Sequence, residues 1–314
     1  MYINHVSHYV PSDRVPNSYF EKVNGLEDQW IFERTGIRSR SKATKQENTN
    51  TMAIEAVKNG FEGSGFKPEE VDLIVGASYS PYDTVYTMGH AVQREFGAVN
   101  AKVVYVSSAC SSLLNAVEIA EGYIAMGKAK NVIVVAAEHN WEYSNESCAK
   151  SGHLWGDGAA AMFISDTPKG NKSAKVAHVY TQGLGHLGKA DASVFLRPSE
   201  EGLGMPDGRD VFINAVTQMR NAIDKVLDAS GKEVSDLSYV VPHQANGRIM
   251  SNLQRQMKLD DGMIFSHIEE FGNTGCASTA ICFSQNYDKV KQDDLVVFTV
   301  FGGGYSVGAM LLQY

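Results

Sequence analysis

The sequence of 314 residues is poor in cysteine, in long apolar runs and in positive charge, and each shortage excludes a class of protein. Its four cysteines, at positions 110, 148, 276 and 282, match no zinc signature and form no C-x-x-C pair. No apolar stretch approaches the ~18 residues that span a bilayer. A net charge of −8 argues against nucleic acid as a partner. We therefore expect no metal site, no membrane segment and no nucleic-acid interface.

The remaining composition is that of a globular protein, with 43% hydrophobic and 20% charged residues. A chain of this length can form one large domain or two halves of roughly 150 residues. The first 14 residues contain two histidines and an aspartate and no apolar run, so they do not form a signal peptide. We therefore expect reduced thiols in a cytoplasmic protein.

Short β-branched runs alternate with segments of helical spacing along the whole chain. The expected strands are Val71–Ala77, Lys102–Val106, Val132–Ala137, Ala160–Ser165, Ala174–Thr181, Leu237–Val241, Leu295–Phe301 and Ser306–Leu312. The expected helices are Thr51–Asn59, Leu113–Met126, Val211–Ala229, Arg248–Met257 and Cys276–Val290. This alternation predicts layered α/β packing with a mostly parallel sheet. The segment Asp166–Ser173, rich in Pro, Gly, Lys and Ser, is the expected boundary between two halves.

Cys110 lies where an expected strand gives way to a long helix, among small residues at positions 107–112. The first turn of a helix has unpaired N–H groups that stabilise a thiolate, so the thiol pKa is expected below its usual value of about 8.5. Small neighbours would let a substrate approach the sulfur. The alternative is a buried, inert cysteine that packs like alanine.

Three further segments carry groups suited to the same chemistry. His243 follows a strand that ends in proline, at the edge where open α/β sheets place their sites. Asn273 stands between two glycines in a loop before a helix. Residues 302–304 are three glycines between two strands, and such a turn can present an N–H to an oxyanion. Taken singly, each also fits a structural histidine, an ordinary helix cap or a bulged hairpin.

Together these segments resemble the β-ketoacyl-acyl carrier protein synthase III family of thiolase-fold enzymes. The resemblance is carried by S-A-C-S-S around residue 110, P-H-Q-A-N around residue 243, G-N-T-G-C-A-S around residue 273 and F-G-G-G-Y-S-V-G-A from residue 301. W-I-F-E-R-T-G-I at residues 30–37 and G-D-G-A at residues 156–159 extend it over nearly the whole chain.

The resemblance implies a five-layered αβαβα fold of two duplicated halves, residues 1–170 with the nucleophile and residues 171–314 with the histidine and asparagine. Cys110 would take an acyl group from acyl-CoA or another acyl thioester. His243 and Asn273 would bind the thioester carbonyl of malonyl-acyl carrier protein, and the enolate left by loss of CO₂ would attack the acyl-Cys110 thioester. The backbone N–H groups of Cys110 and Gly303 would hold the oxyanion. The enzyme would be a homodimer that needs neither metal nor cofactor.

The resemblance also assigns binding residues. Trp30 and Arg34 would contact the nucleotide of CoA, Asn246 would bond the pantetheine arm, and Arg248 would help to dock the acyl carrier protein.

The sequence itself supports a docking face for an acidic partner. Arg248 and Arg255 are seven residues apart on an expected helix, and Lys258 follows its end. They make a local basic face on an acidic protein. An ordinary solvated helix face is the alternative for Arg255 and Lys258.

Three departures from the family pattern concern the substrate. Ser112 stands where the family has glycine, and Lys150 stands in place of an arginine that closes over the CoA adenine. The segment 78–87, whose counterpart reaches the partner's acyl pocket, contains Tyr79, Tyr82 and Tyr86, which would shorten or polarise that pocket. These departures support one alternative to the fatty-acid enzyme, a related acyltransferase or ketosynthase of secondary metabolism with another acceptor. A second alternative is a non-catalytic thiolase-like binding protein, which would lack the Cys, the His or the Asn, and all three are present here.

Overall fold

The computed structural model describes residues 1–169 and 172–314. Its strands are β1 (Tyr2–Tyr9), β2 (Asp13–Pro16), β3 (Ser39–Lys42), β4 (Leu73–Ala77), β5 (Lys102–Val106), β6 (Asn131–Glu138), β7 (Gly158–Ser165), β8 (Ala174–Gly183), β9 (Phe195–Arg197), β10 (Gly202–Gly204), β11 (Tyr239–Pro242), β12 (Leu295–Gly302) and β13 (Ser306–Gln313). Its α-helices are α1 (Asn17–Asn24), α2 (Asp28–Thr35), α3 (Thr49–Ser64), α4 (Met88–Phe96), α5 (Ser112–Ala125), α6 (Asn140–Tyr143), α7 (Gly208–Ser230), α8 (Gly247–Met257), α9 (Ile268–Phe271) and α10 (Ser278–Gln285). No helix in these ranges is long and apolar enough to cross a membrane.

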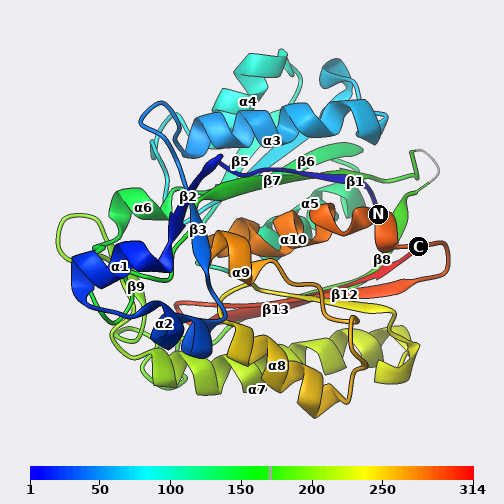
Figure 1. Ribbon diagram of the computed structural model, residues 1–314. Coiled ribbons are helices and arrows are strands. Elements are labelled where there is room, and N and C mark those ends of the chain that lie inside the picture. Colours follow the sequence, from blue (N-terminus) through cyan, green and yellow to red (C-terminus); the bar gives the residue numbers. More distant parts are fainter. Residues whose placement is uncertain (170–171) are drawn as a thin grey trace.

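Helices and strands alternate in five layers (Figure 1). Helices α3 and α4 cover the outer face of β1, β7, β6, β4 and β5, while α7 packs on β8, β13 and β12, with α8 beside it. Helices α5 and α10 lie between the two strand layers and contact both of them. Residues from both layers and from α5 and α10 form one buried apolar cluster. The predicted αβαβα architecture is therefore confirmed.

The strands are joined by hydrogen bonds in the order β11-β12-β13-β8-β1-β7-β6-β4-β5. Parallel pairing joins β4 to β5 and to β6, and β11 to β12. Antiparallel pairing joins the other neighbours in this sheet. The expectation of a mostly parallel sheet was wrong, because β7 runs antiparallel to both β1 and β6, and β13 runs antiparallel to both β8 and β12.

Strand β1, which pairs with β7 and β8 and links the two layers, was not expected from the sequence. Its sequence YINHVSHY contains polar residues on faces that turn out to be buried. Asn4 is accommodated because its amide donates to Ser165 Oγ at 2.7 Å, and Ser7 because its hydroxyl donates to the Ala56 carbonyl at 2.6 Å. Such long-range bonds offset the cost of burying polar groups, and no local pattern indicates them.

The expected helix Cys276–Val290 was wrong as a single element. The chain forms a 3₁₀ turn at Gly275–Ala277, the α-helix α10, and a second 3₁₀ turn at Tyr287–Lys289. Asn286 ends α10, and its side chain donates to the Cys282 carbonyl at 2.8 Å. The expected boundary between the halves includes residues 170 and 171, which lie outside the described residues, and the division into residues 1–170 and 171–314 stays a prediction.

Candidate active site

Cys110 lies at a sharp turn between β5 and α5. The residue before it, Ala109, has a φ of +50°, a left-handed conformation that non-glycine residues seldom adopt. Three serine contacts maintain this turn: Ser108 N–H donates to Ser112 Oγ at 2.8 Å, Ser112 Oγ donates to the Ala109 carbonyl at 2.6 Å, and Ser111 Oγ donates to the Ser108 carbonyl at 2.7 Å. Ser112, one of the departures from the family pattern, therefore has a clear role in holding the turn. The sequence reasoning missed this network, although the unusual run of serines was its signal.

Cys110, His243 and Asn273 line one cavity, together with Gly303. His243 directly follows β11, and Asn273 lies in the loop after α9, so residues separated by more than 160 positions meet here. The histidine is 4% exposed and the asparagine 2%, so water has little access to either. The structure thus brings the three predicted catalytic residues together in a buried site.

His243 is neutral, because burial lowers its pKa to about 4. Its Nδ1 lies 2.7 Å from Ser278 Oγ at the first residue of α10. Ser278 Oγ also accepts from the Gln244 N–H at 3.2 Å, so the serine hydroxyl proton is available for Nδ1. In that arrangement the ring proton is on Nε2, and the imidazole is a donor.

Asn273 is oriented by its own loop. Its Oδ1 accepts the Gly275 N–H at 3.0 Å, which leaves the amide Nδ2 as its free donor group. The Asn273 backbone is held as well, since its N–H donates to the Leu154 carbonyl at 2.9 Å and its carbonyl accepts from Gly156 N–H at 2.9 Å. With His243 this makes two donors in one buried cavity, which suits a developing negative charge on oxygen.

The predicted glycine turn lies directly against the nucleophile. A side chain at Gly302 would place its Cβ 2.6 Å from the Cys110 nitrogen, so only glycine allows this approach. Gly303 follows and lines the cavity that Cys110 lines. The β12–β13 turn therefore approaches the backbone of the α5 turn at Cys110, and an oxyanion site needs backbone N–H groups that lie close together.

The expected low pKa of Cys110 is not what the structure shows. Burial, with a further contribution from the charge of Glu138, raises the pKa of Cys110 to about 12, although a hydrogen bond with Tyr79 acts in the opposite direction. The sequence reasoning considered the helix N-terminus but could not include desolvation, which depends on the tertiary packing. The resting group is a neutral thiol.

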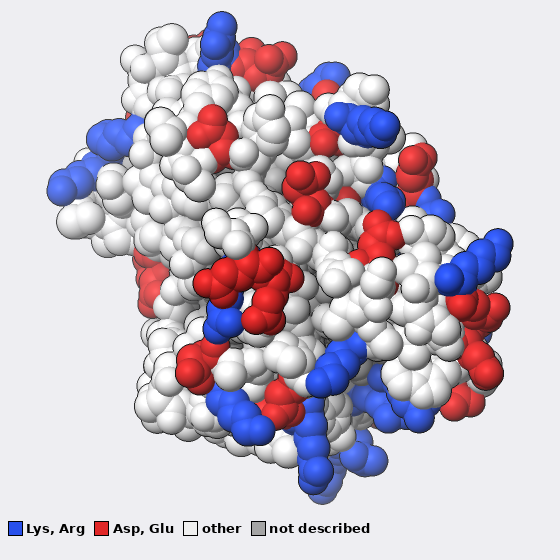
Figure 2. Space-filling model, turned by 90° about the vertical axis from the view of Figure 1, so that its left-hand side faces the viewer, with Lys and Arg blue, Asp and Glu red and all other residues white. Residues whose placement is uncertain are grey.

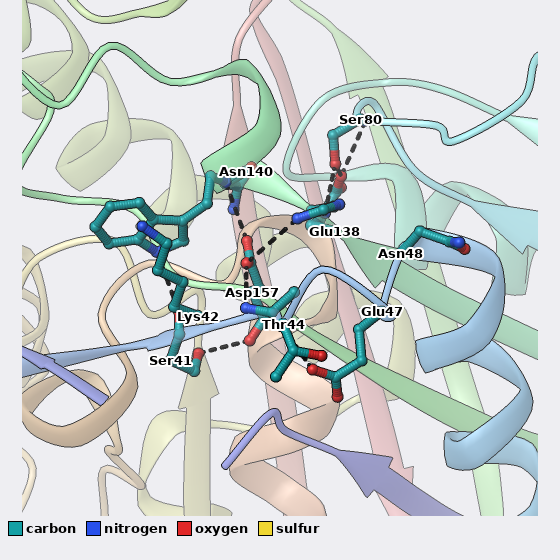
Figure 3. A network of polar contacts seen from close by, with 12 residues as sticks. Ser41, Lys42, Thr44, Glu47, Asn48, Ser80, Glu138, Asn140 and Asp157 are labelled. Carbon is teal, nitrogen blue, oxygen red and sulfur yellow. Dashed lines mark hydrogen bonds and ion pairs between the residues drawn. The ribbon is translucent and has the colours of Figure 1, made fainter. Parts of the chain in front are cut away.

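Three buried polar residues, Glu138, Asn140 and Asp157, belong to the network of polar contacts that Figure 3 shows. Glu138, at the end of β6, accepts from Ser78 Oγ at 2.9 Å and from the Ser80 N–H at 3.0 Å, and burial raises its pKa to about 7. Asn140 is next to it in α6. Asp157, of the G-D-G-A segment, accepts the N–H of Ala43 at 2.8 Å, and burial raises its pKa to about 7. These residues hold strand ends and loops in place rather than facing the cavity of Cys110.

An outer cavity of about 580 Å³ carries the residues assigned to CoA. Trp30, Arg34 and Asn246 line it, and the Arg34 guanidinium already lies 4.2 Å from the centroid of the Trp30 ring. The Asn246 side chain caps α8 by accepting the Arg248 N–H at 2.8 Å and donates to the Arg34 carbonyl at 3.1 Å, so part of its hydrogen-bonding capacity is already used.

The outer cavity is basic. Lys150, Arg209 and Arg248 line it beside Arg34, and all four are exposed. Figure 2 shows the face containing α1 and α2, where Lys and Arg gather in the lower part, towards α7 and α8. Arg209, at the start of α7, was missed because nothing in its local sequence marks it. This cavity and that of Cys110 share the lining residues Met205, Val211, Ala245 and Ile249, so they adjoin.

Several residues that the sequence predicted for substrate or partner binding lie outside these two cavities. Arg255 and Lys258 are exposed at the far end of α8 and line neither cavity. Tyr82 is 66% exposed and Tyr86 41% exposed, and only Tyr79 of the three tyrosines lies beside Cys110 in the same chain. Among residues 1–169 and 172–314 no group of three His, Cys, Asp or Glu is placed to hold a metal ion.

Comparisons with known proteins agree with this geometry. Residues 105–183 match the family described as 3-Oxoacyl-[acyl-carrier-protein (ACP)] synthase III, and residues 227–314 match the one described as its C terminal part. The chain is 34% identical to the beta-ketoacyl-[acyl-carrier-protein] synthase III of Aquifex aeolicus, over 98% of this chain and 97% of that protein. It is 32% identical to the protein of the same name from Oceanobacillus iheyensis, over 98% of this chain and 96% of that protein.

Solved structures show the same similarity. The crystal structure of 3-oxoacyl-[acyl-carrier-protein] synthase III from Aquifex aeolicus has a TM-score of 0.93 and 31% identity, with 99% of each chain covered. The priming beta-ketosynthase from the R1128 polyketide biosynthetic pathway has a TM-score of 0.89 and 28% identity, with 99% of this chain and 95% of that chain covered.

Proposed function

Because the chain belongs to the β-ketoacyl-acyl carrier protein synthase III family, we propose that it catalyses the decarboxylative condensation of a Cys110-bound acyl group with malonyl-acyl carrier protein. The observation that carries this proposal is the convergence of Cys110, His243 and Asn273 on one buried cavity that adjoins a basic outer cavity. The product is a 3-oxoacyl-acyl carrier protein.

In the first half-reaction the Cys110 sulfur attacks the carbonyl of an acyl thioester. The thiol gives up its proton, the acyl group moves to Sγ, and CoA leaves as a thiol that carries a proton away. The high pKa of Cys110 requires that proton transfer accompanies attack, because a free thiolate is scarce at neutral pH. The N–H groups of Cys110 and Gly303 stabilise the tetrahedral oxyanion, and a covalent acyl-enzyme implies ping-pong kinetics.

In the second half-reaction His243 and Asn273 donate hydrogen bonds to the thioester carbonyl of malonyl-acyl carrier protein. The bond to the carboxylate breaks, CO₂ leaves, and the electron pair forms an enolate whose oxygen these donors stabilise. The enolate carbon attacks the acyl carbonyl and Cys110 departs as the leaving group. A neutral His243 suits this role, since the step needs a donor rather than a strong base. Both half-reactions therefore involve side chains and backbone groups of this chain and the two thioester substrates.

The outer cavity is proposed to hold the CoA of the primer and then the phosphopantetheine of the carrier protein. Its four cations suit the phosphates of either ligand. Arg248, at the cavity rim, is proposed to contact the acidic carrier protein. Arg255 and Lys258 lie further along the same helix and extend this basic face.

We further propose a homodimer formed through β5. This strand is at the edge of the nine-stranded sheet, and an unpaired edge is a surface for pairing with another chain. Val85 and Val99, close to this edge in sequence, are 83% and 80% exposed. A dimer interface would cover such apolar side chains. A cytoplasmic location is part of the proposal and is supported by four cysteines that are all free.

The experiment that tests the function follows both half-reactions separately. The purified protein is incubated with acetyl-, butyryl- and longer acyl-CoA thioesters, and the acylation of Cys110 is measured by intact mass. Malonyl-acyl carrier protein is then added, and CO₂ and the 3-oxoacyl product are measured. Light scattering on the same sample tests the dimer.

The expected result is acylation of the wild-type protein, none in the Cys110→Ala variant, and CO₂ release that depends on His243 and Asn273. Equal acylation of Cys110→Ala would disprove the assignment of the nucleophile. Acylation without decarboxylation of the malonyl thioester would instead favour the second candidate, an acyltransferase with another acceptor. The similarity to a polyketide priming synthase and the position of Tyr79 in the cavity of Cys110 support that candidate.

A further inference from the structure

The proposed oxyanion site is built from two segments that are far apart in the sequence. Cys110 belongs to the turn before α5, and Gly303 belongs to the turn between β12 and β13. Both residues line the cavity that contains His243 and Asn273. Groups that stabilise a transition state have to be held within about 0.5 Å of the productive geometry. Contacts between the two turns therefore have to fix their spacing.

Ser306 makes such contacts. It is the first residue of β13 and pairs with Gly302 across the hairpin. Its Oγ lies 2.6 Å from Ser111 Oγ and 3.0 Å from the Ser108 carbonyl oxygen, an acceptor for the serine proton. Among the described residues, these two side-chain hydrogen bonds join residues 107–112 to residues 302–306. Ser306 is therefore the link between the glycine turn and the nucleophile turn.

The hydroxyls of Ser306 and Ser111 and the carbonyl of Ser108 form a self-consistent arrangement. Each hydroxyl has one proton, and Ser111 Oγ lies 2.7 Å from the same carbonyl oxygen. If Ser306 donates to Ser111, then Ser111 donates to the carbonyl. If Ser111 donates to Ser306, then Ser306 donates to the carbonyl. The bond between the two serines is made in both cases, and Ser111 is fully buried, so water does not compete for it.

The link acts where the two backbones are closest. Cys110 lies between Ser108 and Ser111 in the chain, and both of these contact Ser306. Gly302, the strand partner of Ser306, approaches the Cys110 nitrogen so closely that a Cβ there would lie 2.6 Å away. Loss of the Ser306 hydroxyl would leave both backbone N–H groups in the molecule, but it would free the two turns to shift relative to each other.

We propose that Ser306 is a positioning residue for the oxyanion site, whose hydroxyl fixes the Gly303 N–H relative to the Cys110 N–H. Ser306 lines neither of the cavities that Cys110 lines, so it acts through the backbone and not on the substrate. A misplacement of about 1 Å in a catalytic site lowers the rate about 10²-fold, so the effect of this one hydroxyl is measurable. The inference rests on the proposed function and adds a residue to its machinery.

The test compares two reactions of the same sulfur. Acyl transfer from the acyl-CoA that reacts fastest with the wild type passes through a tetrahedral oxyanion. Alkylation by iodoacetamide forms an S–C bond, expels iodide and releases the thiol proton to water, without an oxyanion. Both rates are measured at Cys110 by peptide mass, in the wild type, Ser306→Ala and Ser306→Thr. Ser284→Ala is the matched control, because that hydroxyl donates to the Val6 carbonyl at 3.1 Å and lines neither cavity of Cys110.

Ser306→Ala should lower the rate of Cys110 acylation at saturating acyl-CoA at least about tenfold, with KM within about twofold of wild type. Its rate of alkylation should stay within about twofold of wild type, because that reaction has no oxyanion to stabilise. Ser306→Thr, which keeps the hydroxyl, should restore acylation. Ser284→Ala should leave both rates unchanged.

Equal losses in acylation and alkylation would mean that Ser306 acts on folding or on the thiol itself, and they would overturn the proposal. Wild-type acylation in Ser306→Ala would overturn it too, as would a Ser306→Thr variant as slow as Ser306→Ala. The condensing function stands in each of these outcomes. Failure of every acyl-CoA to acylate wild-type Cys110 instead rejects the proposed function, and the role of Ser306 with it.

Discussion

Ser278 Oγ lies 2.7 Å from Nδ1 of His243, and this contact determines which ring nitrogen is free for the substrate. The serine is the first residue of α10, while the histidine follows β11, so the packing of α10 against the β11 layer sets the tautomer. A histidine whose proton is on Nε2 donates to a carbonyl, and one with the proton on Nδ1 does not.

The first prediction concerns this contact. Ser278→Ala should lower the rate of malonyl decarboxylation about tenfold, because a lost hydrogen bond of about 1–1.5 kcal/mol no longer favours the donor tautomer. Cys110 acylation should stay within about twofold of wild type. Thr279→Val is the matched control, since the neighbouring Thr279 hydroxyl is buried and has no hydrogen-bond partner among the described residues. Equal losses in both half-reactions would mean that Ser278 acts on folding alone.

The second prediction concerns the glycine beside the nucleophile. Gly302→Ala should reduce Cys110 acylation by at least about a hundredfold, because the new Cβ would lie 2.6 Å from the Cys110 nitrogen and displace an oxyanion donor. Gly183→Ala, also at the end of a strand, meets nothing within 4 Å and should keep wild-type rates. Acylation of Gly302→Ala at the wild-type rate would show that this close approach does not form the oxyanion site.

The third prediction concerns the outer cavity and the CoA that it is proposed to bind. Trp30→Ala should raise the KM for acyl-CoA about tenfold and leave kcat unchanged, since stacking on a base contributes about 1–3 kcal/mol. Phe32→Ala is the control: Phe32 is in the same helix and is covered by Arg38 at 3.8 Å, yet it does not line the cavity. Acyl-N-acetylcysteamine, which lacks the nucleotide, should react equally with all three proteins. If Trp30→Ala loses rate with that thioester too, the tryptophan does not recognise the nucleotide.

The fourth prediction concerns acid stability. Burial lowers the pKa of His267 to about 3, and its Nδ1 lies 3.1 Å from Gln285 Oε1. The unfolded chain, with a histidine pKa of about 6.5, binds this proton more readily than the folded protein, so stability is lost as the pH falls below about 6.5. From pH 7 to pH 5 this one group should cost about 2 kcal/mol.

Urea unfolding of the wild type and of His267→Gln, at pH 7 and at pH 5, measures this loss of stability. The variant should be the less stable protein at pH 7, and the difference between the two proteins should shrink by about 2 kcal/mol at pH 5. A difference that is the same at both pH values would contradict a neutral, buried His267.

Elements with strong local patterns were predictable from the sequence. Helix α3 begins two residues before the expected Thr51–Asn59 and extends five residues beyond it, because Asn48 and Thr51 form a capping box and Gly65 ends it in a left-handed conformation. Strand β5 has the expected bounds Lys102–Val106. Strand β1 and the end of α10 at Gln285 were not predictable. Both depend on polar side chains, and the partners of these side chains are far away in the sequence for β1 and specific to one turn for α10.

The sequence by itself indicated the proposed reacting groups, because the segments around Cys110, His243 and Asn273 together resemble those of one enzyme family. The tertiary structure decided how these groups behave. Burial makes Cys110 a neutral thiol where the helix N-terminus alone indicated a thiolate. Packing of distant segments places Ser278 on His243, and it brings Tyr79 and Trp155 to the cavity that Cys110 lines. Desolvation and hydrogen-bond partnership are properties of the folded surroundings, and they do not appear in the order of residues along the chain.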